Sequence, residues 1–284
     1  MADVVVLGTA AADVVVRVDQ LLVPGDHLSA RCLGWRLGGG SANLACGVAA
    51  AGHRVEFVGP FGNDATAGFL REQLHARGVL TGRSFDVEAP TACALILLDP
   101  SGERTILGLD RELATAAYPL AEPPEIGRPD GVWIETYTRF PTDVAERAGD
   151  ALLVVPPPAG PVDHWPADIV IGSEQQFPAG WASSPFAAAR GVAGPRLRWV
   201  VVTRGASGAD AYGEHDVVHV DAVRAARQVD ATGAGDAFAA ALLSGLLDGR
   251  DMEQAMRAGA AAGAAAIEVL QSVPPGGPGD GGGG

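Results

Sequence analysis

Short runs of β-branched and aliphatic residues recur along this chain of 284 residues, and helical patterns separate several of them. The runs occupy residues 4–7, 132–134, 152–155, 169–171 and 199–202. Continuous apolar runs of this length are typical of strands that are buried on both faces of a parallel sheet. Their alternation with helices predicts a doubly wound α/β core, and the chain length suits a single domain.

Two helix starts carry recognisable caps. Asp64 precedes the apolar pattern around Phe69 and fits the N-cap position of that helix. Asp251 and Gln254 resemble a capping box for a helix that runs to Ile267.

Four other segments show a different pattern and predict a second, smaller sheet. Residues 12–18, 28–37, 92–98 and 103–109 read as strands, and residues 99–102 (Asp-Pro-Ser-Gly) read as a hairpin turn. We therefore expect one domain over residues 1–272, with a parallel core from 1–11, 38–90 and 110–272. A small β-sheet lid would come from about 12–37 and 91–109. Residues 273–284 are almost all Gly and Pro and are expected to be disordered.

Composition excludes several classes of function. The chain has no lysine, so Schiff-base chemistry and the lysine of a Walker phosphate loop are both absent. The formal net charge of −14 argues against nucleic acid and anionic membranes as partners. Cys32, Cys46 and Cys93 have neither pairing nor zinc-finger spacing. The N-terminus reads as a core strand and not as a signal peptide, so we expect a cytoplasmic protein.

Residues 230–236 (Asp-Ala-Thr-Gly-Ala-Gly-Asp) open the helix that contains Phe238. The backbone amides of Gly233, Ala234 and Gly235 are poorly shielded and suit an anionic oxygen at a helix N-terminus. Asp236 beside them could accept the proton of an attacking hydroxyl while the amides stabilise a transferring phosphoryl group. The alternative is a glycine-rich turn followed by an ordinary acidic residue of the first turn, and the motif alone does not decide between the two.

Residues 38–43 (Gly-Gly-Gly-Ser-Ala-Asn) open another helix. Gly39 and Gly40 let a ligand approach the backbone closely, and Asn43 can both donate to and accept from a sugar hydroxyl. Taken alone, Asn43 is better explained as an N-cap. Asp13, shortly after the first strand, is by itself a typical turn residue.

Together, and in this order, these pieces resemble the PfkB, or ribokinase-like, family of carbohydrate kinases over most of the chain. The stretches 31–36, 101–107, 133–135 and 208–211 are most similar to its ketohexokinase and fructokinase branch. The resemblance implies a ribokinase-like three-layer α/β core with a small β-sheet lid. It also implies an ATP-dependent sugar kinase that uses Mg²⁺, acts on a ketose such as fructose, and forms a homodimer through the lid.

The same resemblance implies roles for individual residues. Asp236 matches the catalytic base, and the anion hole matches Gly233, Ala234 and Gly235. The sugar-binding positions match Asp13, Gly39, Gly40, Asn43 and Arg104, with Arg104 reaching in from the lid. The nucleotide-binding strand and loop match Thr203, Gly205 and Gly208.

The chain also departs from the family pattern. Residues 173–176 (Ser-Glu-Gln-Gln) stand where the family has an Asn-x-x-Glu motif that organises magnesium, and Glu174 is the candidate substitute. Ala231 replaces a hydroxyl or proline residue, Gly40 replaces a second sugar-contacting Asn of the branch, and His27, next to Asp26, replaces a lid Asp. Two alternatives remain open: a nucleoside kinase of the same fold, and a non-catalytic sugar- or nucleotide-binding relative.

Overall fold

The computed structural model of the protein describes residues 1–20, 23–25, 27, 29–99, 104–109, 123–135, 141–160, 162–227 and 232–268. The predicted disordered tail, Asp26, Asp230, Ala231 and the 99–102 turn beyond Asp99 lie outside the described residues.

The core is a nine-stranded sheet with the order β15-β14-β13-β12-β11-β10-β1-β4-β6. All five aliphatic runs of the sequence are strands of this sheet. The strands are β1 (Asp3–Leu7), β4 (Arg54–Val58), β6 (Val79–Leu80), β10 (Gly131–Ile134), β11 (Leu152–Val155), β12 (Ile169–Ser173), β13 (Trp199–Thr203), β14 (Ala209–Tyr212) and β15 (Val217–Val220).

The expectation of a wholly parallel core is wrong at one edge. Strands β6 to β13 pair in parallel, but β13 pairs with β14, and β14 with β15, in the antiparallel sense. Only residues 204–208 and 213–216 connect these last strands, and a parallel connection needs a crossover of about a dozen residues or more. The short connections therefore force hairpins, so the large sheet is mixed.

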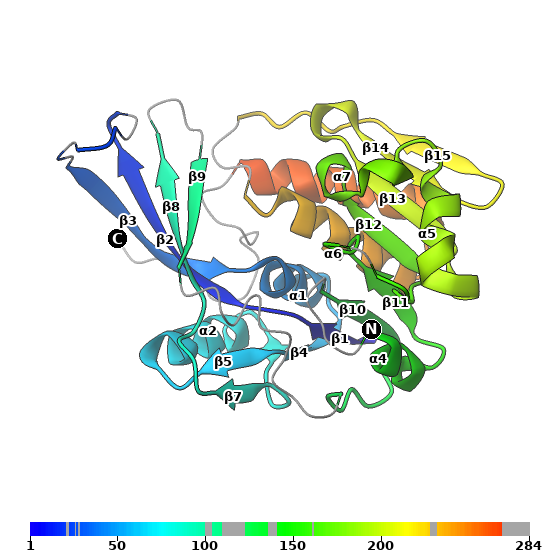
Figure 1. Cartoon of the computed structure of the whole chain (residues 1–284), viewed down its shortest axis with the longest axis horizontal. Coiled ribbons are helices and arrows are strands. Elements are labelled where there is room, and N and C mark those ends of the chain that lie inside the picture. Colours follow the sequence, from blue (N-terminus) through cyan, green and yellow to red (C-terminus); the bar gives the residue numbers. More distant parts are fainter. Residues whose placement is uncertain are drawn as a thin grey trace.

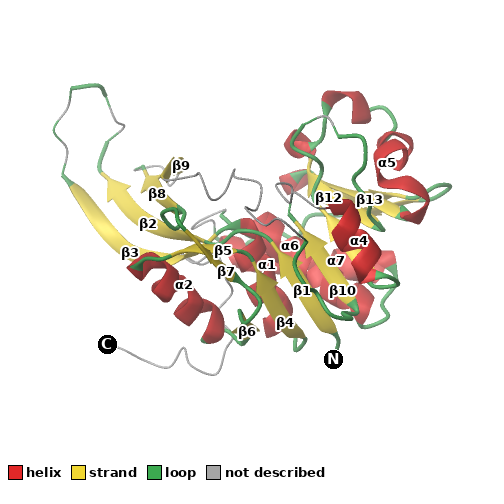
Figure 2. Ribbon diagram, turned by 60° about the horizontal axis from the view of Figure 1, so that its bottom comes forward, coloured by secondary structure: helices red, strands yellow, loops and turns green. Residues whose placement is uncertain are grey.

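Helices cover both faces of the large sheet and produce three layers (Figures 1 and 2). One apolar cluster joins the sheet to α1, α2, α6 and α7, and a second cluster on the other face joins it to α4 and α5. Among the described residues, no helix is long and apolar enough to span a bilayer. The helices are α1 (Gly40–Ala50), α2 (Ala65–His75), α4 (Pro141–Ala148), α5 (Pro185–Ala193), α6 (Ala234–Leu247) and α7 (Met252–Ile267).

The four lid segments form the second sheet, which extends away from the core in Figure 1. Its order is β3-β2-β8-β9, and its strands are β2 (Ala11–Val18), β3 (Ala30–Gly38), β8 (Cys93–Leu98) and β9 (Arg104–Leu109). A two-stranded sheet of β5 (Pro60–Gly62) and β7 (Phe85–Val87) lies beside α2.

Both predicted caps are confirmed. Asp64 accepts a hydrogen bond from the backbone N–H of Ala67, and Asp251 and Gln254 form the capping box of α7. By contrast, α1 and α6 begin at Gly39 and Gly233 without a side-chain cap. These two uncapped helix starts are the ones that the sequence singles out for ligand binding.

Candidate active site

The site residues gather at the carboxyl ends of the parallel strands. Thr9 follows β1, Glu135 follows β10, and the uncapped starts of α1 and α6 face the same region. The small sheet begins here too, because β2 starts two residues after Thr9. Ligands of open α/β sheets bind at this edge, so the fold itself points to the location.

Asp236 is a half-buried carboxylate in the first turn of α6. Gly233 takes a left-handed conformation, with φ of 80°, which turns the chain into the helix and leaves the first amides without a cap. Burial raises the pKa of Asp236 to about 6; the hydrogen bond from Asn43 lowers it, and the charge of Asp13 raises it. A carboxylate of this kind is largely ionised at neutral pH and is poised to accept a proton.

Asn43 is not the N-cap of α1, because Gly39 holds that position. The side chain of Asn43 is buried, and its Nδ2 donates to Oδ2 of Asp236 over 2.9 Å. Its Oδ1 is also buried and has no hydrogen-bond partner within the described part of the chain. Buried polar atoms are almost always satisfied, so this acceptor suits the hydroxyl of a ligand.

Gly39 and Gly40 are glycines for steric reasons. A Cβ on Gly39, whose φ is 90°, would lie 2.7 Å from the carbonyl oxygen of Thr9. A Cβ on Gly40 would lie 3.1 Å from Oδ1 of Asp236. The absence of side chains here keeps the space in front of the Asp236 carboxylate open.

Asp13 is the second carboxylate of the site, and it is buried. It lies on β2 and forms an ion pair with Arg36 on β3, with 3.5 Å between Oδ2 and Nε. Gly38 fits tightly against it, because a Cβ there would lie 2.2 Å from Oδ1 of Asp13. The structure thus brings Asp13 into the electrostatic reach of Asp236, two residues that the resemblance to the family places in one site.

Glu135 is a third carboxylate of the site, and it is not among the residues predicted from the sequence. It accepts from the backbone N–H and Oγ1 of Thr9 at 2.6 Å and 3.0 Å, and Ser41 also bonds to it. Burial is the main cause of its raised pKa, and the charge of Asp236 adds to the rise. Trp133 donates from Nε1 to Oγ of Ser41 over 3.2 Å. A carboxylate directly after a buried parallel strand was the signal that could have found it.

The predicted nucleotide-binding residues lie further along the same edge. Thr203 ends β13, and its hydroxyl donates to the carbonyl oxygen of Gly172 over 3.4 Å. Gly205 and Gly208 bound the short 3₁₀ turn that follows, with φ of 53° and 81°. A Cβ on Gly208 would lie 2.2 Å from the carbonyl oxygen of Val220. The turn is therefore held close to β15 and presents open backbone at the strand ends.

Glu174 follows β12 and is already paired. Its Oε1 accepts from Nε of Arg204 over 3.0 Å, and 61% of its side chain is exposed. Ser173 and Gln176 cap each other in the same short turn, so neither side chain points to a metal-binding role. No group of three or more His, Cys, Asp or Glu in the described residues could hold a metal ion. This donor set fits a Mg²⁺ ion held chiefly by nucleotide phosphates and water.

Comparison with known proteins agrees with this geometry. The model of the pfkB family carbohydrate kinases matches residues 1–275.

The chain belongs to the pfkB family of carbohydrate kinases.

Its curated relatives include a fructokinase from Salmonella typhimurium, 28% identical over 74% of this chain and 76% of the relative. An acarbose 7(IV)-phosphotransferase from an Actinoplanes species is 29% identical over 94% of this chain and 92% of the relative. The solved ribokinase of Arabidopsis thaliana, complexed with ribose and ATP, superimposes with a TM-score of 0.77. That structure is 24% identical, and the match covers 96% of each chain. The chain is thus an ATP-binding phosphotransferase with an alcohol acceptor on a ribokinase-like fold.

Arg104 is the predicted site residue that the structure does not bring to this kinase site. It is exposed at the start of β9 and pairs with Leu98. The cross-strand row of Asp13 runs instead through Ala94 to Gly108, four residues further along β9. At about 3.3 Å per residue, Arg104 lies about 13 Å along the strand from that row. His27, the other lid position noted in the sequence, is exposed.

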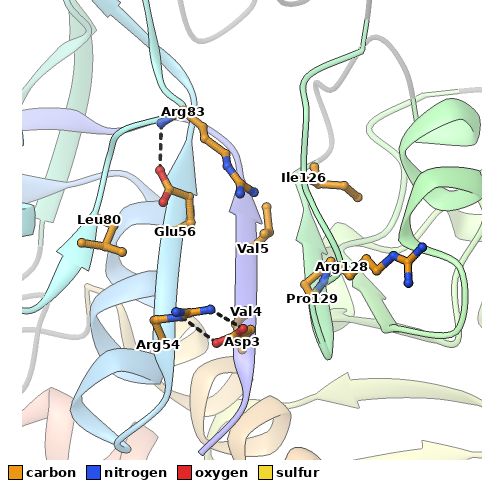
Figure 3. Close-up of a pocket in the computed structure, with 10 residues that line it drawn as sticks. All are labelled: Asp3, Val4, Val5, Arg54, Glu56, Leu80, Arg83, Ile126, Arg128 and Pro129. Carbon is orange, nitrogen blue, oxygen red and sulfur yellow. Dashed lines mark hydrogen bonds and ion pairs between the residues drawn. The ribbon is translucent and has the colours of Figure 1, made fainter.

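One cavity lies at the opposite ends of β1 and β4, away from the predicted site residues (Figure 3). Its volume is about 290 Å³. Its acidic groups are engaged: Asp3 pairs with Arg54, and Glu56 accepts from the backbone N–H of Arg83. Because it lies at the amino ends of the strands, we do not assign it to the phosphoryl-transfer site. It is lined by Asp3, Val4, Val5, Arg54, Glu56, Leu80, Arg83, Ile126, Arg128 and Pro129.

Proposed function

We propose that the protein transfers the γ-phosphoryl group of ATP to a hydroxyl of a small carbohydrate, with a ketose such as fructose as the first candidate. One observation carries the proposal: a carboxylate with a raised pKa, Asp236, stands in the first turn of an uncapped helix at the carboxyl edge of the sheet. The fructokinase relative supports a ketose, and the branch-specific stretches of the sequence point the same way.

In this proposal Asp236 is the catalytic base. It takes the proton of the sugar hydroxyl as the new O–P bond forms and the bond from the γ-phosphorus to the ADP oxygen breaks. The amides of Gly233, Ala234 and Gly235 face the charge that develops on the transferring phosphoryl group. Because these groups are fixed by the helix start, they need little reorganisation during the reaction.

The sugar is held by the polar groups around Asp236. Asp13 and Glu135 accept from its hydroxyls, and the unpaired Oδ1 of Asn43 takes another. Gly39 and Gly40 provide the room. A site lined by buried or half-buried carboxylates and a buried amide suits a neutral polyol better than an apolar or anionic ligand.

ATP lies along the strand ends at Thr203, Gly205 and Gly208. Mg²⁺ neutralises its phosphates when bound, and phosphates and water supply most of the metal's ligands, with Glu174 at its periphery. No lysine is available to share this task.

A nucleoside acceptor is the weaker candidate. Trp35 is the aromatic residue of the lid that could grip a base, and 57% of it is exposed. Side chains alternate along a strand, so Trp35 projects from the face of the small sheet opposite to Arg36 and Asp13. This placement favours a sugar over a nucleoside.

The outer face of the small sheet supports the proposed homodimer. Trp35, Val14, Leu95 and Leu107 share one cross-strand row, and Leu109 lies on the same face. Trp35, Leu107 and Leu109 are exposed. An exposed apolar row of this kind suits a second copy of the lid. Light scattering that finds only monomer at assay concentrations would contradict it.

The test of the function is a coupled assay of ADP release with a panel of ketoses, aldoses, sugar acids and nucleosides. We expect turnover with one class of small sugar. Turnover with nucleosides alone would show that the acceptor is a nucleoside and not a small sugar. ATP consumption by none of them, in a protein that binds both sugar and ATP, would favour a non-catalytic relative.

A further inference from the structure

Two carboxylates, the buried Asp13 and the half-buried Asp236, share one site, and the charge of Asp13 adds to the raised pKa of Asp236. A site with two such groups is stable only if at least one of them is compensated. Asn43 provides a neutral donor to Asp236. Arg36 provides the positive charge at Asp13.

The contact between Arg36 and Asp13 is built into the small sheet. The two residues are direct cross-strand partners on β3 and β2, so their side chains lie on the same face. Their side chains are only 11% and 7% exposed. The Asp13 carboxylate packs against the backbone of Gly38, two residues after Arg36. The strand pairing on one side and the backbone of Gly38 on the other therefore fix the position of the Asp13 carboxylate.

The protonation state of Asp13 decides what it can do for a sugar. An ionised carboxylate has only acceptors and can accept hydrogen bonds from two hydroxyls. A protonated carboxyl group uses one of its oxygens as an O–H donor instead. Burial favours the protonated form, whereas a guanidinium within ion-pair distance favours the ionised form. The balance at Asp13 thus depends on Arg36.

We propose that Arg36 is a positioning residue that keeps Asp13 ionised and correctly aimed for the hydroxyls of the sugar. The proposal rests on the proposed sugar kinase function and adds a specific determinant of sugar affinity to it. Arg36 acts through Asp13 and has no part in ATP binding or in proton transfer. Its removal should therefore weaken sugar binding far more than it slows turnover.

The kinetic test compares three variants on the sugar that the wild type phosphorylates. Arg36→Met removes the charge and keeps an unbranched side chain, and Arg36→Lys restores a charge without the planar fork. Arg31→Met, an exposed position on the same strand, is the matched control. We expect Arg36→Met to raise the KM for sugar about 10-fold to 100-fold, the range for a lost interaction with a charged group. The kcat and the KM for ATP should stay within about 3-fold, Arg36→Lys should recover part of the loss, and Arg31→Met should match the wild type.

Three kinetic outcomes overturn the proposal: an unchanged KM for sugar in Arg36→Met, an Arg36→Lys variant as impaired as Arg36→Met, or the same defect in Arg31→Met. A loss confined to sugar acids would also overturn it, because Arg36 would then bind the substrate directly.

A second measurement does not depend on any substrate. Carboxyl ¹³C NMR of protein labelled at aspartate follows the titration of Asp13, with its signal assigned from Asp13→Asn. Among the described residues of the elements packed against it, Arg36 on β3 and Asp236 on α6 are charged groups close to Asp13, and β8 contributes Ala94. We expect the Asp13 carboxyl to titrate at a higher pH in Arg36→Met than in the wild type. An unshifted titration overturns the role of Arg36 even if sugars are phosphorylated, whereas absence of sugar turnover with a shifted titration overturns only the proposed function.

Discussion

The carboxylates at the two ends of the active-site edge differ in their surroundings and in the direction of their pKa shifts. At the sugar end, Asp236 and Glu135 are half-buried, and desolvation of the carboxylates is the main cause of their raised pKa values. At the nucleotide end, Asp210 and Glu174 both pair with Arg204. Burial raises the pKa of Asp210, but His219 and Arg204 outweigh it, and the pKa is lowered.

This difference assigns the chemistry. A general base must be ionised, within reach of the hydroxyl and close to neutral in pKa, so that it can take a proton and give it back. Asp236 meets these conditions. The oxygens of Asp210 already accept hydrogen bonds from residues on or next to β13, β14 and β15, so its role is to link these strands. We expect the nucleotide end to be a scaffold and the sugar end to carry the reaction.

The largest expected effect is the loss of the base. Asp236→Asn keeps the shape and can still accept the hydrogen bond from Asn43, but it cannot take the proton. Replacement of a positioned base typically costs about 10²–10⁴-fold in rate, so kcat should fall by that factor. Steady-state kinetics with sugar and ATP measure it.

The matched control is Asp210→Asn at the other end of the edge. It should keep kcat within about tenfold, since Asp210 has no contact with the reacting groups in the proposed mechanism. Asp236→Asn should also unfold no more readily than the wild type at pH 8. Desolvation raises the pKa of Asp236 to about 6 and so disfavours its charged form in the folded state, and the substitution removes that charge. Equal losses of kcat in both variants would contradict the assignment of the reaction to the sugar end alone.

The second effect is on the pH dependence of the reaction. The pKa of Asp236 is raised to about 6, so the base becomes protonated as the pH falls through that value. kcat/KM should then fall about tenfold for each pH unit below about 6, and it should be level just above it. A profile that stays level down to pH 4.5, on protein that remains folded, would mean that another group is the base.

The sequence predicted the fold more completely than the site. Aliphatic runs marked the strands of the core, because burial on both faces leaves a strong local signal. The antiparallel edge was missed because β14 and β15 are short and carry Asp210 and His219 among their apolar residues. Glu135 and the Arg36–Asp13 pair were missed for another reason: their partners are distant in the sequence or lie across two strands, and only the register brings them together.

The third effect concerns the metal. Glu174→Ala removes an exposed ion pair with Arg204, and exposed pairs contribute about 0–1 kcal/mol. We therefore expect the Mg²⁺ concentration for half-maximal activity to change by less than about 5-fold, with kcat nearly unchanged. Excess chelator should still abolish turnover, since the triphosphate needs a cation. A loss of Mg²⁺ affinity of two orders of magnitude would make Glu174 a direct ligand, and undiminished turnover in chelator would contradict the need for metal.

The smallest effect is expected for Arg104. The resemblance to the family predicts that this arginine stabilises the transferring phosphoryl group, and such a role would cost at least about tenfold in kcat when removed. Its place on β9, four residues beyond the row that contains Asp13, instead leaves it about 13 Å away along the strand. A catalytic role would require the far end of the small sheet to fold over the core.

We expect Arg104→Ala to change kcat and the KM for sugar by less than about twofold. Steady-state kinetics decide it, with Arg31→Ala as an exposed arginine on the opposite edge strand of the same sheet. A tenfold fall in kcat for Arg104→Ala alone would show that the sheet closes during turnover and that the sugar end of the site is incomplete until it does.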